Sequence, residues 1–274
     1  SNQNKSGIII SLTTIPSRFA HIIPTIKSLL AQSRSPQEII IYIPKYSVRE
    51  QAAYLIPKEL VNLNSLKVVE VSKDWGPATK FIPAILSQTK DQKILVVDDD
   101  NIYPSSMLKD FYDYSLKHVH CILTTSGWRV PIDLVDRPTT LWSNIKKTPP
   151  TPVTGRRVAG LYKTDIIQGY SGYLIKPKFF DGEEMCDYSG TPKAARFVDD
   201  VWVSAQSKAE KYIFPCRRLC YSVFWNKKLY QGSSLAKINN CGKEDYSLRN
   251  NSIMIKHFEQ KWNQSRSEVE QSTE

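Results

Sequence analysis

The most informative stretch of the chain reads Ile94-Leu95-Val96-Val97-Asp98-Asp99-Asp100-Asn101-Ile102-Tyr103-Pro104. The apolar run predicts a buried strand, and three carboxylates follow where that strand would end. Three adjacent anions repel one another, so a fold keeps them together most easily when a divalent cation neutralises them. Oxygen-only ligands suit Mg²⁺ or Mn²⁺. Because open α/β sheets bind ligands outside the carboxyl ends of their strands, the stretch predicts a metal site that holds a phosphate-bearing ligand. The alternative is a solvated acidic turn.

Composition and charge narrow the class of protein. A chain of 274 residues can form one large domain or two small ones, and 41% hydrophobic residues fit a globular protein. The formal net charge of +10 favours anionic partners such as nucleic acid, acidic lipid, nucleotide sugars or acidic glycans. The basic pairs are separate from one another: Lys146-Lys147, Arg156-Arg157, Arg217-Arg218 and Lys227-Lys228. This spacing is typical of a solvated surface, so we expect no nucleic-acid partner, and peripheral membrane contact through the basic surface stays open.

Cysteine usage and the chain start bear on the compartment. The five cysteines form no C-x-x-C pair and no zinc spacing with histidine, which favours a reducing, cytoplasmic setting. The sequence contains no apolar run of membrane-spanning length and no signal peptide. Ser1-Asn2 resembles a tag remnant, so the sequence is compatible with a membrane anchor upstream of Ser1.

Strand and helix patterns alternate in the first half of the chain. Strands are expected over 7–12, 38–44, 66–71 and 94–97, and helices over 20–32, 53–60 and 79–87. This alternation predicts a parallel, doubly wound nucleotide-binding sheet.

The second half is less regular. Here the patterns predict a helix over 107–117, a strand over 121–124, long loops over 130–165, a glycine turn and strand over 169–175, and a helix over 198–211. The expected organisation is a tag or disordered start (1–6), one catalytic domain (7–260, with halves 7–104 and 105–260) and a polar tail (261–274).

Four segments carry a resemblance to a known class. They are Ser11-Leu12-Thr13-Thr14-Ile15-Pro16-Ser17-Arg18, Asp74-Trp75-Gly76-Pro77-Ala78-Thr79-Lys80, Val97-Asp98-Asp99-Asp100, and Val198-Asp199-Asp200-Val201-Trp202-Val203-Ser204. Their order and spacing resemble the GT-A glycosyltransferases, including small bacterial and large-DNA-virus members. The resemblance covers residues 7 to about 210. It implies an α/β fold with a Rossmann-like, mostly parallel sheet flanked by helices, and a smaller, mixed sheet on the acceptor side.

The resemblance implies roles on the donor side. It places Thr13, Thr14 and Arg18 near the nucleotide base and diphosphate, and Asp74 and Lys80 beside the nucleotide sugar. Asp98 would approach the ribose and the metal, and Asp100 would bind the metal directly. Asp99 could share the role of Asp98 or that of Asp100. The chemistry agrees, because a divalent ion stabilises the charge on a departing nucleoside diphosphate. For Arg18 and Lys80, the alternative is an ordinary solvent-exposed cation.

The second acidic pair, Asp199-Asp200, precedes a predicted helix. One carboxylate would suffice for an N-cap, whereas inverting GT-A enzymes keep their general base at this place. The prediction is Asp200 as base, with Asp199 binding the acceptor or serving as base instead. Gly169 and Gly172 resemble the glycine segment where the acceptor approaches the donor in this class, and the resemblance also implies His257 as an added metal ligand. Tyr170, which could stack on a sugar ring, and Trp202 are further candidate acceptor contacts.

The predicted function is a metal-dependent hexosyl- or pentosyltransferase that moves sugar from a UDP-sugar to a glycan or glycoconjugate hydroxyl. The late His-x-x-Gly-x-x-Lys-Pro segment of one retaining group is missing, which favours inversion. The strongest alternative is a haloacid-dehalogenase-like phosphohydrolase using Asp98 and Asp100, although its motif usually follows the first strand. A nucleotidyltransferase and a non-catalytic anion-binding protein are weaker alternatives.

Overall fold

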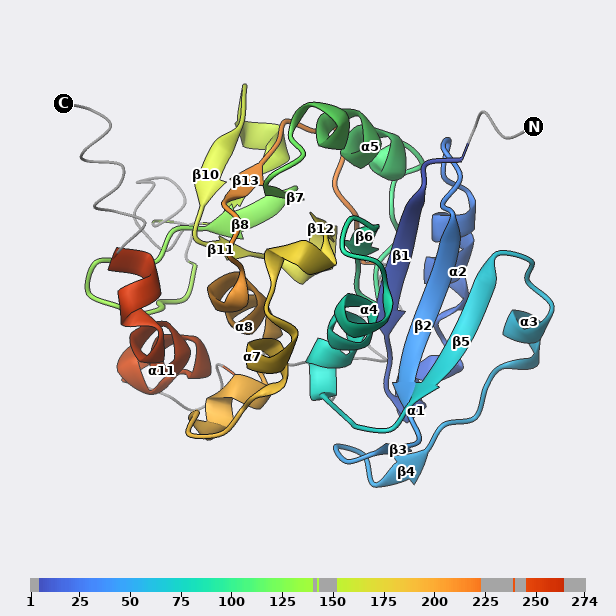
Figure 1. The fold of residues 1–274 in the computed structure, drawn as a ribbon, viewed down its shortest axis with the longest axis horizontal. Helices are drawn as coiled ribbons and strands as arrows, with labels where there is room; N and C mark the ends of the chain where they lie inside the picture. Colours follow the sequence, from blue (N-terminus) through green and yellow to red (C-terminus); the bar gives the residue numbers. More distant parts are fainter. Residues whose placement is uncertain (1–4, 140–141, 143–151, 223–238, 240–244, 264–274) are drawn as a thin grey trace.

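The central element of the computed structural model is an eight-stranded sheet in the order β10-β13-β7-β12-β6-β1-β2-β5 (Figure 1). The structure describes residues 5–139, 142, 152–222, 239 and 245–263. The strands of this sheet are β1 (Ile8–Thr13), β2 (Glu38–Pro44), β5 (Leu66–Val71), β6 (Lys93–Val96), β7 (Ile122–Thr124), β10 (Tyr162–Thr164), β12 (Tyr173–Ile175) and β13 (Lys211–Ile213).

One half of the sheet is parallel. Strands β6, β1, β2 and β5 pair in parallel, with Ile10 of β1 opposite Leu95 on one side and Ile39 on the other. Successive side chains of a strand point to opposite faces. Accordingly, Ile9 joins one hydrophobic cluster while Ile8 and Ile10 join the other. Burial on both faces explains why these strands read as continuous apolar runs.

The other half of the sheet is mixed. Strand β12 is antiparallel to both β6 and β7, β13 is parallel to β7, and β10 is antiparallel to β13. Two small antiparallel sheets complete the fold, formed by β8 (Ser126–Trp128), β9 (Val153–Thr154) and β11 (Ile166–Ile167), and by β3 (Tyr46–Ser47) and β4 (Ala52–Ala53). The expected α/β fold with a mostly parallel sheet is confirmed, but the smaller sheet is antiparallel and the mixed pairing lies in the large one.

Helices cover both faces of the sheet (Figure 1). Side chains of α1 (Pro16–Phe19), α2 (Ile23–Leu30) and α5 (Met107–Lys117) belong to one buried cluster, and those of α4 (Ile82–Ser87), α8 (Asp199–Gln206) and α11 (Asn250–His257) belong to the other. The shorter elements are α3 (Lys58–Val61), α7 (Gly182–Cys186), η2 (Gly76–Lys80), η3 (Gly155–Arg157), η4 (Gly169–Ser171), η5 (Pro177–Phe179), η6 (Lys193–Arg196) and η7 (Tyr246–Leu248). None of the helices that the structure describes has the length and apolar character needed to cross a bilayer.

Several expected helices differ from the structure. The helix expected over 53–60 is wrong: an irregular stretch follows β4, and α3 begins only at Lys58 because Pro57 disfavours helix before it. The expected helices over 20–32 and 79–87 begin later, as α2 and α4, and each carries a proline in its first turn. The helix expected to reach 211 ends at Gln206, because Lys211 already belongs to β13.

Two described residues near the chain ends, Ser6 and Trp262, are packed into the fold, although the sequence predicted otherwise. Ser6 is 5% exposed and its hydroxyl accepts a hydrogen bond from the Ile8 amide, so the ordered fold begins before residue 7. Trp262 is 3% exposed and its indole donates to the Ile255 carbonyl, so this residue of the predicted tail belongs to the fold. The rest of both segments, and much of the loop region expected over 130–165, lies outside the described residues.

Candidate active site

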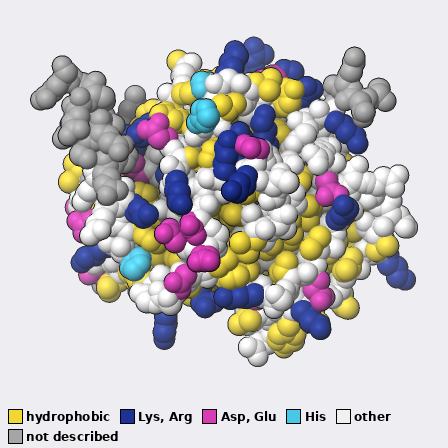
Figure 2. Space-filling view, in the orientation of Figure 1, with side chains coloured by type: hydrophobic (Ala, Val, Ile, Leu, Met, Phe, Trp, Pro, Cys, Tyr) yellow, Lys and Arg dark blue, Asp and Glu magenta, His cyan; other side chains and the backbone are white. Residues whose placement is uncertain are grey.

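The carboxyl ends of β1 and β6 lie side by side, because these strands pair in parallel. Thr14 therefore lies beside the acidic run that follows β6, and its hydroxyl donates to Asp99 Oδ2 at 2.6 Å. The turn η4 and the first residues of α8 reach the same place from the second half of the chain. On the face shown in Figure 2, Asp and Glu side chains lie at several separate places among Lys and Arg, so the surface charge alone does not mark the site.

Lys80 joins the two acidic clusters. Its Nζ lies 2.7 Å from Asp98 Oδ1 and 2.7 Å from Asp199 Oδ2, and its side chain is only 7% exposed. Burial alone would lower the pKa of Lys80, but Asp199 and Asp98 outweigh it and hold the pKa well above its ordinary value. The alternative of a solvent-exposed cation is therefore wrong for Lys80.

Replacing Lys80 with Met should destabilise the protein by about 3–5 kcal/mol, because it leaves buried carboxylates without their cation. The free energy of unfolding in urea measures the effect. The Lys67→Met variant is the control, since the Lys67 side chain is 64% exposed and its ion pair with Glu38 is open to solvent. Equal stability of Lys80→Met and Lys67→Met would contradict the assigned role of Lys80.

Gly169 allows the close approach of η4 to this cluster. Its amide donates to Asp200 Oδ1 at 2.9 Å. A Cβ at this position would lie 2.7 Å from Lys80 Nζ and 3.1 Å from Asp200 Oδ1. This close contact leaves no room for a Cβ, which explains why a glycine stands at this position of the site.

Replacing Gly169 with Ala should cost about 1–3 kcal/mol of stability, because the added methyl group displaces charged neighbours in a filled space. Thermal unfolding measures this loss. Gly160→Ala is the matched control, because a Cβ there meets nothing within 4 Å. Equal melting temperatures of Gly169→Ala and Gly160→Ala would contradict the close contact of Gly169 with Lys80 and Asp200.

Arg18 is the second cation of the site. Its Nη1 lies 3.1 Å from Asp99 Oδ1 and 3.7 Å from Asp100 Oδ2, and the side chain is 14% exposed. Asp99 is thus held by both Arg18 and Thr14. Five carboxylates share this region with Arg18 and Lys80: Asp98, Asp99, Asp100, Asp199 and Asp200. The excess of negative charge favours a further cation.

Asp100 is one of the acidic residues that this crowding affects. Burial, followed by the charges of Asp99 and Asp98, raises the pKa of Asp100 to about 7. Its side chain remains 30% exposed, and Asn101 Nδ2 donates to its Oδ1 at 3.0 Å. A divalent cation would relieve the same repulsion that raises this pKa.

The described residues do not form an all-protein metal cage. No group of three or more His, Cys, Asp or Glu side chains among them is arranged to hold a metal ion. Mg²⁺ is usually held by one or two carboxylates together with substrate phosphates and waters, and such a site needs fewer protein ligands. Asp100 and Asp98, both 30% exposed, fit that kind of shared site.

Asp200 lies in the first turn of α8. The N-cap of this helix is Val198, and no side chain caps it, so the capping alternative is wrong for Asp199 and Asp200. Burial, followed by the nearby charge of Asp199, raises the pKa of Asp200 well above its ordinary value. A carboxylate with a raised pKa is a better proton acceptor, which is what a general base requires.

Other predicted site residues have structural contacts. The Thr13 hydroxyl donates to the Tyr42 carbonyl, and the Asp74 carboxylate accepts from the amides of Val48 and Gly76. Asp74 therefore ties the β3–β4 hairpin to the turn before η2. The hydroxyl of Tyr170 donates to Ser126, on the β8 side of η4.

Two predictions are corrected by the structure. Trp202 is 1% exposed and stacks on Tyr188 with ring centroids 4.0 Å apart, so it is a core residue that cannot contact an acceptor. His257 is exposed at the end of α11, where its ring contacts Phe258. It belongs to no metal-binding group among the described residues, so the structure does not bring it to the acidic cluster.

Two tyrosines of the site were missed from the sequence. Tyr103 accepts a hydrogen bond from the Asp98 amide at 2.9 Å and donates to the Tyr170 carbonyl at 3.0 Å, linking the acidic run to η4. Tyr173 is fully buried, and its hydroxyl has no hydrogen-bond partner within the described part of the chain. Gly172, whose φ is 93°, precedes Tyr173. The glycine turn and strand predicted over 169–175 included Tyr173 but did not assign it to the site.

Comparisons with known proteins give a distant structural likeness. No family model and no curated protein matches the sequence. The crystal structure of S. aureus TarS 1-349 is 14% identical with a TM-score of 0.45, covering 93% of this chain and 68% of that one. Its complex with UDP is 13% identical with a TM-score of 0.44, covering 93% and 69%. Another S. aureus TarS structure gives 16% and 0.43, and this chain spans 40% of its length. A likeness of this size does not identify a function.

Proposed function

We propose that the protein is a metal-dependent, inverting glycosyltransferase of the GT-A type, which moves a sugar from a UDP-sugar to a hydroxyl of a glycan or glycoconjugate. One observation carries the proposal: buried Lys80 joins Asp98, the first carboxylate of the acidic run, to Asp199, the neighbour of Asp200. A donor site and a general base would have to meet in this way for direct displacement. The preference for uridine rests on the resemblance of the four sequence segments.

The donor side would be built on the acidic run after β6. Asp100 and Asp98 would hold Mn²⁺ or Mg²⁺ together with the diphosphate, and the ion would stabilise the charge of the leaving group as a Lewis acid. Arg18, close to Asp99 and Asp100, would add a positive contact to the phosphate oxygens. Lys80 would hold Asp98 in place while remaining charged.

The acceptor side would be built on the first turn of α8. Asp200 would take the proton of the acceptor hydroxyl as its oxygen forms a bond to the anomeric carbon. The bond between that carbon and the β-phosphate oxygen would break at the same time, so the configuration would invert. Asp199 would stay paired with Lys80 beside the base. The amide of Gly169 would orient the Asp200 carboxylate.

The position of the acidic run argues against the phosphohydrolase alternative. In that class the nucleophilic aspartate usually follows the first strand, whereas here β1 ends in Thr13 and the acidic run follows β6. The Asp98 carboxylate that would act as nucleophile also accepts a hydrogen bond from Lys80. Both features favour a holding role for Asp98 over a nucleophilic one.

A thermal-shift panel of nucleotides and nucleotide sugars, with and without Mn²⁺, tests the proposal. A ligand that binds the native state raises the melting temperature by linkage. We expect a Mn²⁺-dependent rise with UDP and with one or two UDP-sugars, and none with the other nucleotides. No shift with any nucleotide would refute the donor assignment and direct attention to phosphatase substrates.

A further inference from the structure

Two arginine pairs that are distant in the sequence meet on the surface. Arg156-Arg157 follows Gly155, and Arg217-Arg218 follows Cys216. The Gly155 carbonyl accepts a hydrogen bond from the Cys216 amide at 3.0 Å. A Cβ on Gly155 would lie 2.4 Å from the Phe214 carbonyl oxygen, so the two backbones are in direct contact. We call these four residues the arginine patch.

The arginine patch is strongly positive. All four of its residues are exposed, and none of the ion pairs found among the described residues includes one of them. Asp110 on α5 lies nearby: burial raises its pKa, and Arg217 lowers it in part. Guanidinium groups are planar donors that match carboxylate and phosphate. Several of them held close together attract an anion.

A cavity of about 470 Å³ lies at the arginine patch. In the described part of the chain it is lined by Arg156 and Arg157 together with Thr139, Pro152, Thr154 and Leu219. Its volume is in the range of small-molecule sites, about 300–1,000 Å³. A recess of this kind suits the binding of a discrete anionic group better than contact with the flat surface of a bilayer.

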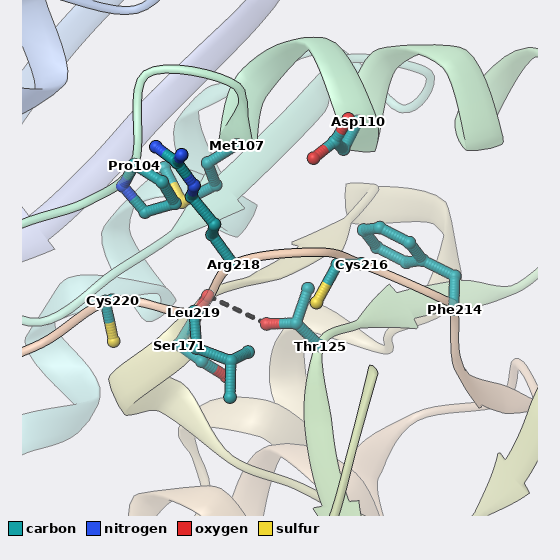
Figure 3. Close-up of a pocket in the computed structure, with 10 residues that line it drawn as sticks. All are labelled: Pro104, Met107, Asp110, Thr125, Ser171, Phe214, Cys216, Arg218, Leu219 and Cys220. Atoms are coloured by element: carbon teal, nitrogen blue, oxygen red, sulfur yellow. Dashed lines mark hydrogen bonds between the residues drawn. The ribbon is translucent and has the colours of Figure 1, made fainter. Parts of the chain in front are cut away.

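The chain leads from the arginine patch directly to the candidate active site. Leu219 and Arg218 line the small hollow in Figure 3, together with Ser171 and Cys220. The Cys220 thiol donates to the Tyr170 carbonyl at 3.1 Å, and Tyr221 pairs with Ile102, two residues after Asp100. The hollow itself is only about 10 Å³, room for about one water, so it is not the binding site.

We propose that the arginine patch binds an acidic part of the acceptor, so that the acceptor is a glycan bearing carboxylate or phosphate groups. The inference rests on the proposed function, because it assigns the acceptor of that same site. From the sequence alone, the two arginine pairs were predicted to lie apart on a solvated surface. The fold joins them beside a cavity and along the segment that reaches the carboxylates.

Binding of hexagalacturonate to the full chain tests the proposal, with maltohexaose as the uncharged comparison. We expect hexagalacturonate to bind, maltohexaose not to bind, and the affinity to fall as salt rises. The double variant R156Q/R157Q should bind hexagalacturonate about tenfold more weakly or worse, because charge-assisted contacts are lost. The control K27Q/K58Q removes the same charge from exposed residues elsewhere and should bind like the wild type.

Two outcomes would overturn the proposal. One is equal hexagalacturonate binding by R156Q/R157Q and the wild type. The other is that the double variant loses binding only to phosphatidylserine vesicles, which would assign the arginine patch to a membrane. Mn²⁺-dependent UDP binding, measured on the same samples, should be unchanged in R156Q/R157Q. If the wild type does not bind UDP, the proposed function is refuted. The binding of hexagalacturonate to the arginine patch is then judged separately from its own measurement.

Discussion

Replacing Asp200 with Asn should lower the rate of sugar transfer by about 10²–10⁴-fold while UDP binding stays unchanged. The carboxylate that accepts the proton is lost, whereas Asp98, Asp100 and Arg18 on the donor side keep their contacts. Burial and the charge of Asp199 raise the pKa of Asp200. The wild-type rate should therefore rise with pH through a pKa above the ordinary carboxyl value, since only the ionised form accepts a proton.

The matched control for this experiment is Asp91→Asn, because Asp91 is a surface carboxylate paired with Lys178. It should transfer sugar like the wild type. UDP release in the presence of acceptor gives the rate, and a UDP titration gives the affinity. Full turnover by Asp200→Asn would move the base elsewhere, and Asp199 would be the next residue to test.

Replacing Asp100 with Ala should abolish the Mn²⁺-dependent part of UDP binding. Asp100 keeps 30% of its side chain exposed at the end of the acidic run, where an ion shared with a diphosphate would be held. Calorimetric titration of UDP with and without Mn²⁺ measures the difference. Asp91→Ala should behave like the wild type. Unchanged Mn²⁺-dependent binding by Asp100→Ala would refute the metal assignment.

A stability measurement on Asp100→Asn adds an independent check without any ligand. The folded-state pKa of Asp100 is raised to about 7, so the folded protein binds a proton more tightly than the unfolded chain. The ionised carboxylate therefore costs stability as pH rises from about 4 to 7. At pH values above this window, Asp100→Asn should be at least as stable as the wild type. A lower melting temperature for the variant would show that the ionised carboxylate stabilises the fold.

The sequence predicted the parallel strands and the acidic run well, because both depend on local patterns. Strands β2 and β5 have the expected bounds, and Asp98 follows β6 as expected. Lys80 could not be distinguished from a surface lysine, since its two partners lie far away in the chain. Trp202 was misassigned for a different reason: Tyr188, which covers its ring, comes from a segment with no strong sequence pattern.

The arginine patch shows a further limit of sequence patterns. The sequence contains the two pairs and the glycine, but the backbone contact between Gly155 and Cys216 exists only in the fold. Tyr103 and Tyr173 are similar cases, because a tyrosine near a predicted strand is most often a core residue. The metal, the donor and the acceptor stay predictions that binding experiments decide.

Anomalous scattering of manganese from a crystal of the protein grown with UDP and Mn²⁺ would locate the ion that the proposed donor site requires. We expect one manganese peak at the Asp100 carboxylate and the diphosphate of UDP, with Arg18 beside the phosphates and Asp200 facing the open side of the donor. UDP bound away from the carboxyl end of β6, or a diphosphate held without any metal at Asp100, would contradict the proposed donor site.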